Sequence, residues 1–249
     1  MMLLMSMLPE GFPSTAAPLT GPVLSEQQWL SVAFLHWRVD PALVSPLLPR
    51  GTEPDCLDGA TYVGLVAFRM HRAGLGTGVP LPWLGTFPET NVRLYSRDQQ
   101  GHHGVVFRSL EATRLATVLA ARLMYRVPYT WARMRVQARA HTWRYRSHRR
   151  WPVPRASSDV AVRVGEPVTP TEVEVFLTAR WGLHSRIAGR TIFTPNEHEP
   201  WPLHEAELVH FRDGLVPAAG IEVDGLPDLR VLWSPGVRSR FAAPVVVAN

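Results

Sequence analysis

Residues 87–95 read Phe-Pro-Glu-Thr-Asn-Val-Arg-Leu-Tyr, and the interpretation of the whole chain depends on this stretch. Side chains alternate between the two faces of a β-strand. A strand here therefore places Glu89, Asn91 and Arg93 on one face. Same-face neighbours lie roughly 6.5–7 Å apart at the usual strand rise, close enough to converge on one small ligand. The alternative is an ordinary surface strand whose polar face meets water.

The composition excludes several kinds of chemistry. The 249 residues, 46% of them hydrophobic, suffice for one large domain with a core. All 26 residues in the Lys+Arg total are arginine, so no side-chain amine can form a Schiff base. The single cysteine, Cys56, excludes an intramolecular disulfide, and the nearby Asp55 and Asp58 disfavour its thiolate.

Charge and hydropathy restrict the partners and the compartment. The net charge of +5 permits nucleic-acid binding without indicating it, so we expect no nucleic-acid partner. No apolar run approaches the ~18 residues of a membrane span. The apolar start lacks a basic region and ends at Pro9, which is not typical of a signal peptide. We expect a cytoplasmic protein without a membrane partner.

Hydrophobic periodicity predicts a β-rich chain. Strands are predicted at residues 29–39, 61–70, 87–95, 105–110, 134–145, 159–164, 192–193, 206–211 and 229–233. Helices are predicted after Asp40, over 111–126 with Ser109 as cap, and over 170–180, where Thr169 and Glu172 form a capping box and Pro170 takes the first helical position. Turns are predicted at 98–104, which makes a hairpin, and at Ser-Pro-Gly 234–236.

The chain divides into a tail and one domain. Residues 1–24 contain four prolines and no amphipathic period, which predicts a flexible tail that is dispensable for stability. No repeat, low-complexity block or linker splits residues 25–249. We therefore expect a single domain over residues 25–249.

Seven groups of short motifs follow one another along this domain. They are Trp-Arg-Val-Asp-Pro at 37–41 with Leu-Leu-Pro at 47–49, Asp-Gly at 58–59, Glu-Thr-Asn-Val-Arg-Leu-Tyr at 89–95, Gly-Val-Val-Phe-Arg-Ser-Leu at 104–110, Val-Pro-Tyr at 127–129, His-Glu-Pro-Trp-Pro-Leu at 198–203 and Ser-Pro-Gly-Val at 234–237. Together they resemble the YqjF-like family of uncharacterised proteins. That family looks like a branch of the acetoacetate decarboxylase-like superfamily. The resemblance implies an α+β, β-rich fold: a cone-shaped antiparallel β-barrel with two or three packed helices and an internal ligand cavity.

The resemblance also implies where a site should lie. In acetoacetate decarboxylases an arginine, a glutamate and a buried lysine form the site, and a neighbouring cation activates the lysine. Arg38 and Glu89 match the arginine and the glutamate in kind and order. Tyr129, after Pro128, stands where the relatives keep their lysine. The imine mechanism of the decarboxylases cannot carry over to a chain without lysine.

Glu89 is the candidate catalytic residue. Burial inside the fold would raise the pKa of its carboxyl and make it a general acid or base. A structural ion pair with Arg93 or Arg38 is the alternative. We expect Glu89, Arg93 and Arg38 to point into one internal cavity with Tyr129 at its wall. The candidate ligand-binding residues are Arg38, Asn91, Arg93, Tyr129 and His198, of which the arginines could hold a carboxylate or phosphate.

The pattern gives no indication of a metal or a cofactor. His198, His204 and His210 are more widely spaced than the usual metal-ligand pairs. The glycines at 74, 76 and 78 miss the dinucleotide-binding spacing, and Pro80 and Pro82 prevent a helix from following them. We therefore expect neither a metal nor a cofactor.

Three classes of function remain. The first is a lysine-independent acid–base enzyme acting on a small carboxylate or carbonyl compound. The second is a non-catalytic protein that binds such a ligand in the same cavity. The third, more remote, is a nucleic-acid or protein interaction module that uses the arginine-rich hairpin. A homo-oligomer is compatible with each class.

Overall fold

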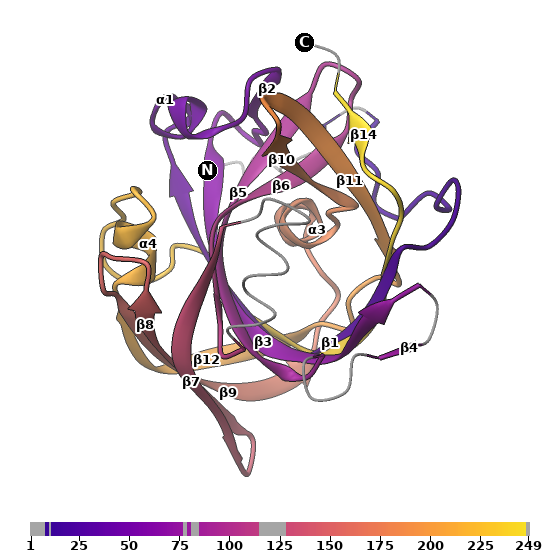
Figure 1. The fold of residues 1–249 in the computed structure, drawn as a ribbon. Helices are drawn as coiled ribbons and strands as arrows, with labels where there is room; N and C mark the ends of the chain where they lie inside the picture. Colours follow the sequence, from indigo (N-terminus) through magenta and orange to yellow (C-terminus); the bar gives the residue numbers. More distant parts are fainter. Residues whose placement is uncertain (1–7, 10, 77–78, 81–84, 115–127, 248–249) are drawn as a thin grey trace.

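The computed structural model describes residues 8–9, 11–76, 79–80, 85–114 and 128–247 (Figure 1). The strands in these ranges form one 14-stranded sheet. They are β1 Ser25–Val39, β2 Thr52–Pro54, β3 Thr61–Leu75, β4 Val79–Pro80, β5 Phe87–Asp98, β6 His103–Ala112, β7 Tyr129–Arg139, β8 Thr142–Trp151, β9 Ser157–Pro167, β10 Gly182–Ile187, β11 Arg190–His198, β12 His204–Asp213, β13 Leu232–Phe241 and β14 Val245–Val246. The described helices are short: α1 Pro41–Val44, η1 Ser45–Leu47, α3 Glu172–Thr178 and α4 Leu215–Ala218. The β-rich α+β expectation is confirmed.

The strand pairings return on themselves. Because β6 pairs with both β5 and β7, the path β6–β7–β8–β9–β12–β13–β1–β3–β5 leads back to β6. A further pairing joins β11 to β13. Figure 1 shows α3 on the inner side of the curved strands. The pairs β6–β7 and β6–β10 are parallel, which departs from the all-antiparallel expectation. A parallel pair needs a longer connection than a hairpin, and residues 113–128 supply it between β6 and β7.

Strand β5 lies between β3 and β6 and is largely buried on both faces. One face carries Val92 and Leu94, which belong to a large hydrophobic cluster with side chains of β1, β3, β8 and β9. The other face carries Glu89 and Asn91, which are 3% and 4% exposed. The predicted alternation is therefore present, but the surface-strand alternative is wrong, because the polar face is enclosed by protein.

The predicted helix over 111–126 does not begin where expected. Glu111 and Ala112 belong to β6 and pair with β5 on one side and β7 on the other. The Glu111 carboxylate forms a buried ion pair with Arg149 of β8, 2.5 Å from its guanidinium. This long-range pairing determines the local structure, whatever the helical spacing of the sequence. Most of the predicted helix falls on 115–127, outside the described residues.

Three predicted boundaries also move. The stretch 134–145 spans two strands, β7 and β8, because the chain reverses at Ala140, whose φ of 50° is left-handed. The capping box of α3 is formed by Thr171 and Glu174, two residues later than predicted. Residues 234–236 continue β13 rather than turning the chain. A Cβ at Gly236 would lie 2.0 Å from the Trp29 carbonyl oxygen, so this glycine serves a close approach of β13 to β1.

The described part of residues 8–24 contacts the domain. The Phe12 ring lies 5.3 Å from the Phe176 ring of α3. Trp181 donates a 2.6 Å hydrogen bond through Nε1 to the Pro13 carbonyl, and the Leu19 amide donates to the Glu197 carboxylate at 3.0 Å. The boundary at residue 24 stays a prediction, but these contacts are arguments against a segment free of the domain.

Candidate functional site

Glu89 and Tyr129 meet across two strands that are not neighbours. Glu89 on β5 is in register with Ala112 of β6, and the adjacent pair Leu110–Tyr129 joins β6 to β7. The Tyr129 hydroxyl therefore reaches past β6 and donates a 2.9 Å hydrogen bond to Glu89 Oε2. The structure thus brings together two residues that lie 40 positions apart in the sequence.

The buried Glu89 carboxyl has no ionic partner among the described residues. Neither Arg93 nor Arg38 forms an ion pair with it, so the structural ion-pair alternative is not realised in the described ranges. Burial raises the pKa of Glu89 to about 7, although hydrogen bonds from Tyr129 and Asn91 oppose the rise. A carboxyl with this pKa holds and releases its proton near neutral pH, as general acid–base chemistry requires.

Arg93 is half-buried and only partly used by the protein. Its Nε donates to the Tyr95 hydroxyl at 3.1 Å, and its Nη2 donates to the Leu177 carbonyl at 3.0 Å. Its guanidinium also lies 5.7 Å from the centre of the Phe34 ring. Nη1 makes no hydrogen bond to any described residue. One edge of the guanidinium is therefore fixed, and Nη1 remains for a further acceptor.

A buried tyrosine and a buried histidine support Arg93. The Tyr95 hydroxyl lies 2.7 Å from His36 Nε2 and is fully enclosed. Gly64 on the intervening strand makes this approach feasible, since a Cβ there would lie 3.1 Å from the His36 ring. Burial lowers the pKa of His36 well below its ordinary value, and the charge of Arg93 lowers it further. His36 is therefore neutral at pH 7.

His198 lies in a group of tryptophan rings. Its ring centre is 4.6 Å from Trp181, 5.0 Å from Trp201 and 5.7 Å from Trp29. Burial lowers the pKa of His198 to about 4; hydrogen bonding to the Glu199 backbone opposes this, and the charge of Arg93 adds to it. His198 is therefore neutral as well, and Arg93 is near enough to act on it electrostatically.

Arg38 does not join the other candidate residues. It stands at the end of β1, is exposed, and places its guanidinium 5.7 Å from the centre of the Tyr62 ring. This exposure argues against the expectation that Arg38 points into one cavity with Glu89 and Arg93, which stays a prediction. The physical reason is position: the same face of β1 carries His36 inside the fold, but the strand reaches the surface at Arg38.

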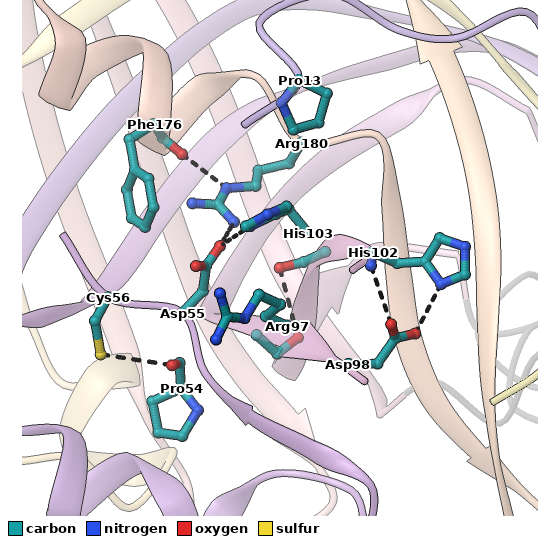
Figure 2. A network of polar contacts seen from close by, with 12 residues as sticks. Pro13, Pro54, Asp55, Cys56, Arg97, Asp98, His102, His103, Phe176 and Arg180 are labelled. Atoms are coloured by element: carbon teal, nitrogen blue, oxygen red, sulfur yellow. Dashed lines mark hydrogen bonds and ion pairs between the residues drawn. The ribbon is translucent and has the colours of Figure 1, made fainter. Parts of the chain in front are cut away.

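The sequence analysis missed a buried ionic network (Figure 2). The Asp55 carboxylate pairs with the Arg180 guanidinium and lies 2.7 Å from His103 Nδ1. Burial would raise the pKa of Asp55, but Arg180 and His103 together hold it below its ordinary value. Arg180 also lies 4.8 Å from the centre of the Tyr95 ring. The network therefore abuts the residues that hold Arg93.

A second polar group lies nearby, around Asp98 at the end of β5. Its carboxylate is 2.8 Å from His102 Nδ1 and 3.2 Å from His184 Nε2, and Figure 2 shows the His102 contact. The other ring nitrogen of His184 lies 2.8 Å from Ser96 Oγ. Ser96 is fully buried, and this serine–histidine–aspartate arrangement joins β5 to β10. In the sequence, the adjacent histidines at 102 and 103 after Asp98 are the feature that could have indicated this polar group.

The remaining expectations concern cysteine, metals and membranes. Burial raises the pKa of the Cys56 thiol, and Asp55 adds to the rise, as expected for an unreactive cysteine. Over the described ranges no three His, Cys, Asp or Glu side chains gather as a metal site would require. No helix in those ranges has the length and apolar character needed to cross a membrane.

The basic patch of the arginine-rich hairpin is predicted at Arg144, Arg146, Arg149 and Arg150, and three of these four have partners. Arg144 bonds both oxygens of Asp159 at 2.7 Å, and Arg149 is buried against Glu111. Arg146 donates to the Gln137 amide oxygen. Arg150 is exposed beside the Trp131 ring, 5.4 Å from its centre. The hairpin therefore uses much of its positive charge within the sheet, which weakens the interaction-module alternative.

Comparison with known sequences identifies relatives over most of the chain. The DUF2071 family, described as an uncharacterized conserved protein, matches residues 26–238. The uncharacterized protein YqjF of Bacillus subtilis (strain 168) is 27% identical over 200 residues, which cover 80% of this chain and 82% of that protein.

Solved structures with the same fold are distant in sequence. An acetoacetate decarboxylase-like enzyme from Sphingomonas wittichii RW1 is 11% identical with a TM-score of 0.62, over 94% of this chain and 99% of that one. Acetoacetate decarboxylase from Legionella pneumophila is 15% identical with a TM-score of 0.60, over 96% and 94%. The enduracididine biosynthesis enzyme MppR, solved with pyruvate, is 15% identical with a TM-score of 0.60, over 97% and 95%. These likenesses establish an acetoacetate decarboxylase-like fold.

Proposed function

The chain belongs to the DUF2071 family, and on that premise we propose that it binds a small carboxylate or carbonyl compound at the polar face of β5. We further propose that Glu89 acts on this compound as a general acid–base without forming an imine. The observation that carries the proposal is the buried Glu89 carboxyl, whose pKa is raised to about 7 and which is hydrogen-bonded to Tyr129. Burying a carboxyl without a neighbouring cation costs free energy of folding. Groups with such strongly shifted pKa values are concentrated at functional sites.

Each neighbouring residue has a role in the proposal. Arg93 holds the anionic group of the ligand through Nη1, which no described residue occupies. Tyr129 and Asn91 orient the Glu89 carboxyl by donating to it. His198 completes the side of the site near Arg93. Arg93 and Tyr129 are half-buried, so both retain some contact with solvent beside the enclosed Glu89.

The chemistry proposed for Glu89 is proton transfer next to a carbonyl group. Its carboxylate removes a proton from the carbon beside the carbonyl, and the carboxylic acid returns a proton to that carbon or to the carbonyl oxygen. A pKa near 7 leaves both forms of Glu89 populated at neutral pH. The absence of lysine makes this the available route, because no side-chain amine can form an imine.

We propose as well that the returning path of strands is the cone-shaped barrel of the fold relatives, with an internal cavity at this face. The closure of the path through β5 and β6 supports this, as do the TM-scores near 0.6. MppR was solved with pyruvate, a small carbonyl acid of the class proposed here. A crystal structure with a bound acid would test the cavity directly.

A ligand screen followed by an exchange assay tests the proposal. Small carboxylates and carbonyl compounds should raise the melting temperature of the protein, and the hits should exchange protons beside the carbonyl for deuterium in D₂O. We expect Arg93→Gln to abolish the thermal shift, and Arg38→Gln, the matched change at an exposed arginine, to preserve it. Glu89→Gln should retain binding and lose exchange.

Other outcomes decide between the classes. Binding without exchange would leave a ligand-binding protein rather than an enzyme. If no acid or carbonyl compound binds, the site assignment is wrong. Nucleic-acid binding with a steep dependence on salt, lost on neutralising Arg150, would support the interaction-module class instead.

A further inference from the structure

The tautomer of His198 is fixed by its backbone contact. Its Nδ1 lies 2.6 Å from the Glu199 carbonyl oxygen. A carbonyl oxygen carries no proton, so Nδ1 must be the donor. The neutral ring then has a bare lone pair on Nε2. No described residue donates to Nε2, which makes this atom an unused hydrogen-bond acceptor.

The surroundings of His198 preserve this state. Trp181, Trp201 and Trp29 hold the ring in place on several sides. Burial among them lowers the pKa of His198, and the charge of Arg93 contributes in the same direction. The imidazole therefore stays neutral across the physiological range, and Nε2 accepts a proton donor instead of becoming one.

Arg93 and His198 are linked through a pair of aromatic rings. The Arg93 guanidinium lies 5.7 Å from the Phe34 ring centre. Phe34 meets Trp201 edge to face at 5.1 Å, and Trp201 packs 5.0 Å from His198. Trp201 and Arg93 also bond successive carbonyls at the end of α3, those of Thr178 and Leu177. Arg93 with its unused donor and His198 with its unused acceptor therefore pack against the same cluster of aromatic side chains.

We propose that the ligand is a hydroxy acid, whose carboxylate is bound by Arg93 Nη1 and whose hydroxyl donates a hydrogen bond to His198 Nε2. This inference rests on the proposed function, because it assigns the substrate class of the same site; in a hydroxy acid the proton that Glu89 would transfer is the one on the carbon beside the carboxylate. An oxo acid of the same size offers an acceptor where the hydroxyl offers a donor. Its carbonyl oxygen would face the Nε2 lone pair without a hydrogen between them.

The discrimination has an expected size. A buried acceptor that loses its donor forfeits a hydrogen bond and keeps the desolvation cost. This corresponds to about a tenfold or larger change in Kd. We expect lactate to bind at least tenfold more tightly than pyruvate and propionate. The longer set, 3-hydroxybutyrate against acetoacetate and butyrate, tests whether the hydroxyl lies one carbon further from the carboxylate.

Isothermal titration of these six acids into wild type, His198→Phe and His198→Gln tests the proposal. His198→Phe retains an aromatic ring between the tryptophans but has no acceptor, so it should bind hydroxy and oxo acids equally. His198→Gln can place an amide oxygen near the position of Nε2 and should restore part of the preference. His204→Phe changes a histidine outside the tryptophan group and should leave the preference intact.

The outcomes separate this inference from the proposed function. If acids bind to wild type but oxo acids match or exceed hydroxy acids in both sets, the hydroxy-acid assignment is wrong and the site remains. A hydroxyl preference that survives in His198→Phe also overturns it. If none of the six acids binds but another carboxylate or carbonyl compound does, only this inference fails; if no such compound binds, the proposed function fails with it. The wild-type comparison does not depend on whether any variant folds.

Discussion

The free energy of unfolding should depend on pH through Glu89, and Glu89→Gln should remove that dependence. Burial raises the pKa of Glu89 from its ordinary 4.5 to about 7. Between these values the folded protein keeps the Glu89 proton that the unfolded chain has released. Because the folded state binds more protons there, the free energy of unfolding falls as the pH rises through this window.

The magnitude follows from the two pKa values. The interval from 4.5 to about 7, at 1.36 kcal/mol per pH unit, corresponds to about 3 kcal/mol. The Tyr129 hydroxyl, 2.9 Å from Oε2, can donate equally well to the amide oxygen of glutamine, so this contact survives the change. We expect the stability of Glu89→Gln, relative to wild type, to increase by about 3 kcal/mol between pH 4 and pH 8.

Urea unfolding at several pH values measures this difference. The nine tryptophans provide the fluorescence signal, and subtracting the two proteins cancels the titration of every other group. Glu166→Gln, at an exposed glutamate, is the control and should show a difference that is independent of pH. A difference for Glu89→Gln that is equally flat would refute the reasoning, because Glu89 would then titrate as it does in water.

Further expectations concern covalent chemistry, the N-terminal segment and the buried ion pairs. Borohydride treatment with a β-keto acid should leave no reduced adduct on any side chain, and intact-mass detection of one would contradict the lysine-free mechanism. Phe12→Ala should lower the melting temperature by about 4 °C, since it removes half-buried ring contacts. Deletion of residues 1–24 should lower the melting temperature at least as much. An unchanged melting temperature in both proteins would support a flexible tail. Arg149→Met should cost about 3–5 kcal/mol, because it leaves a buried carboxylate unpaired, whereas Arg144→Met at the surface should cost far less in the same urea titration.

The sequence predicted the elements whose pattern is local. The alternation in 87–95 correctly placed Glu89, Asn91 and Arg93 on one face of a strand. The strand over 29–39 and the cap at Asp40 are also present. Period-two alternation and capping residues depend on a few neighbours in the chain, so they can be interpreted without knowledge of the fold.

Other features depended on distant partners. The apolar residues of the predicted helix 111–126 have helical spacing, but Glu111 lies in a strand. Its ion pair with Arg149 and the pairing of β6 with β7 determine its position. Arg38 has the right neighbours in sequence, yet its side chain is exposed where β1 reaches the surface, one residue before the strand ends. Asp55 and Arg180 are 125 positions apart, and nothing between them in the chain indicates that they meet. Such features follow from strand order and register, which a single sequence does not specify.

The most direct test of the account is ¹³C NMR of the glutamate side-chain carboxyls, with Glu89 assigned from the spectrum of Glu89→Gln. The account predicts a Glu89 carboxyl that titrates near pH 7 in the free protein, and whose resonance moves on addition of a small hydroxy acid in wild type but not in Arg93→Gln. A Glu89 carboxyl that titrates near 4.5 and does not respond to any acid would contradict the central claim.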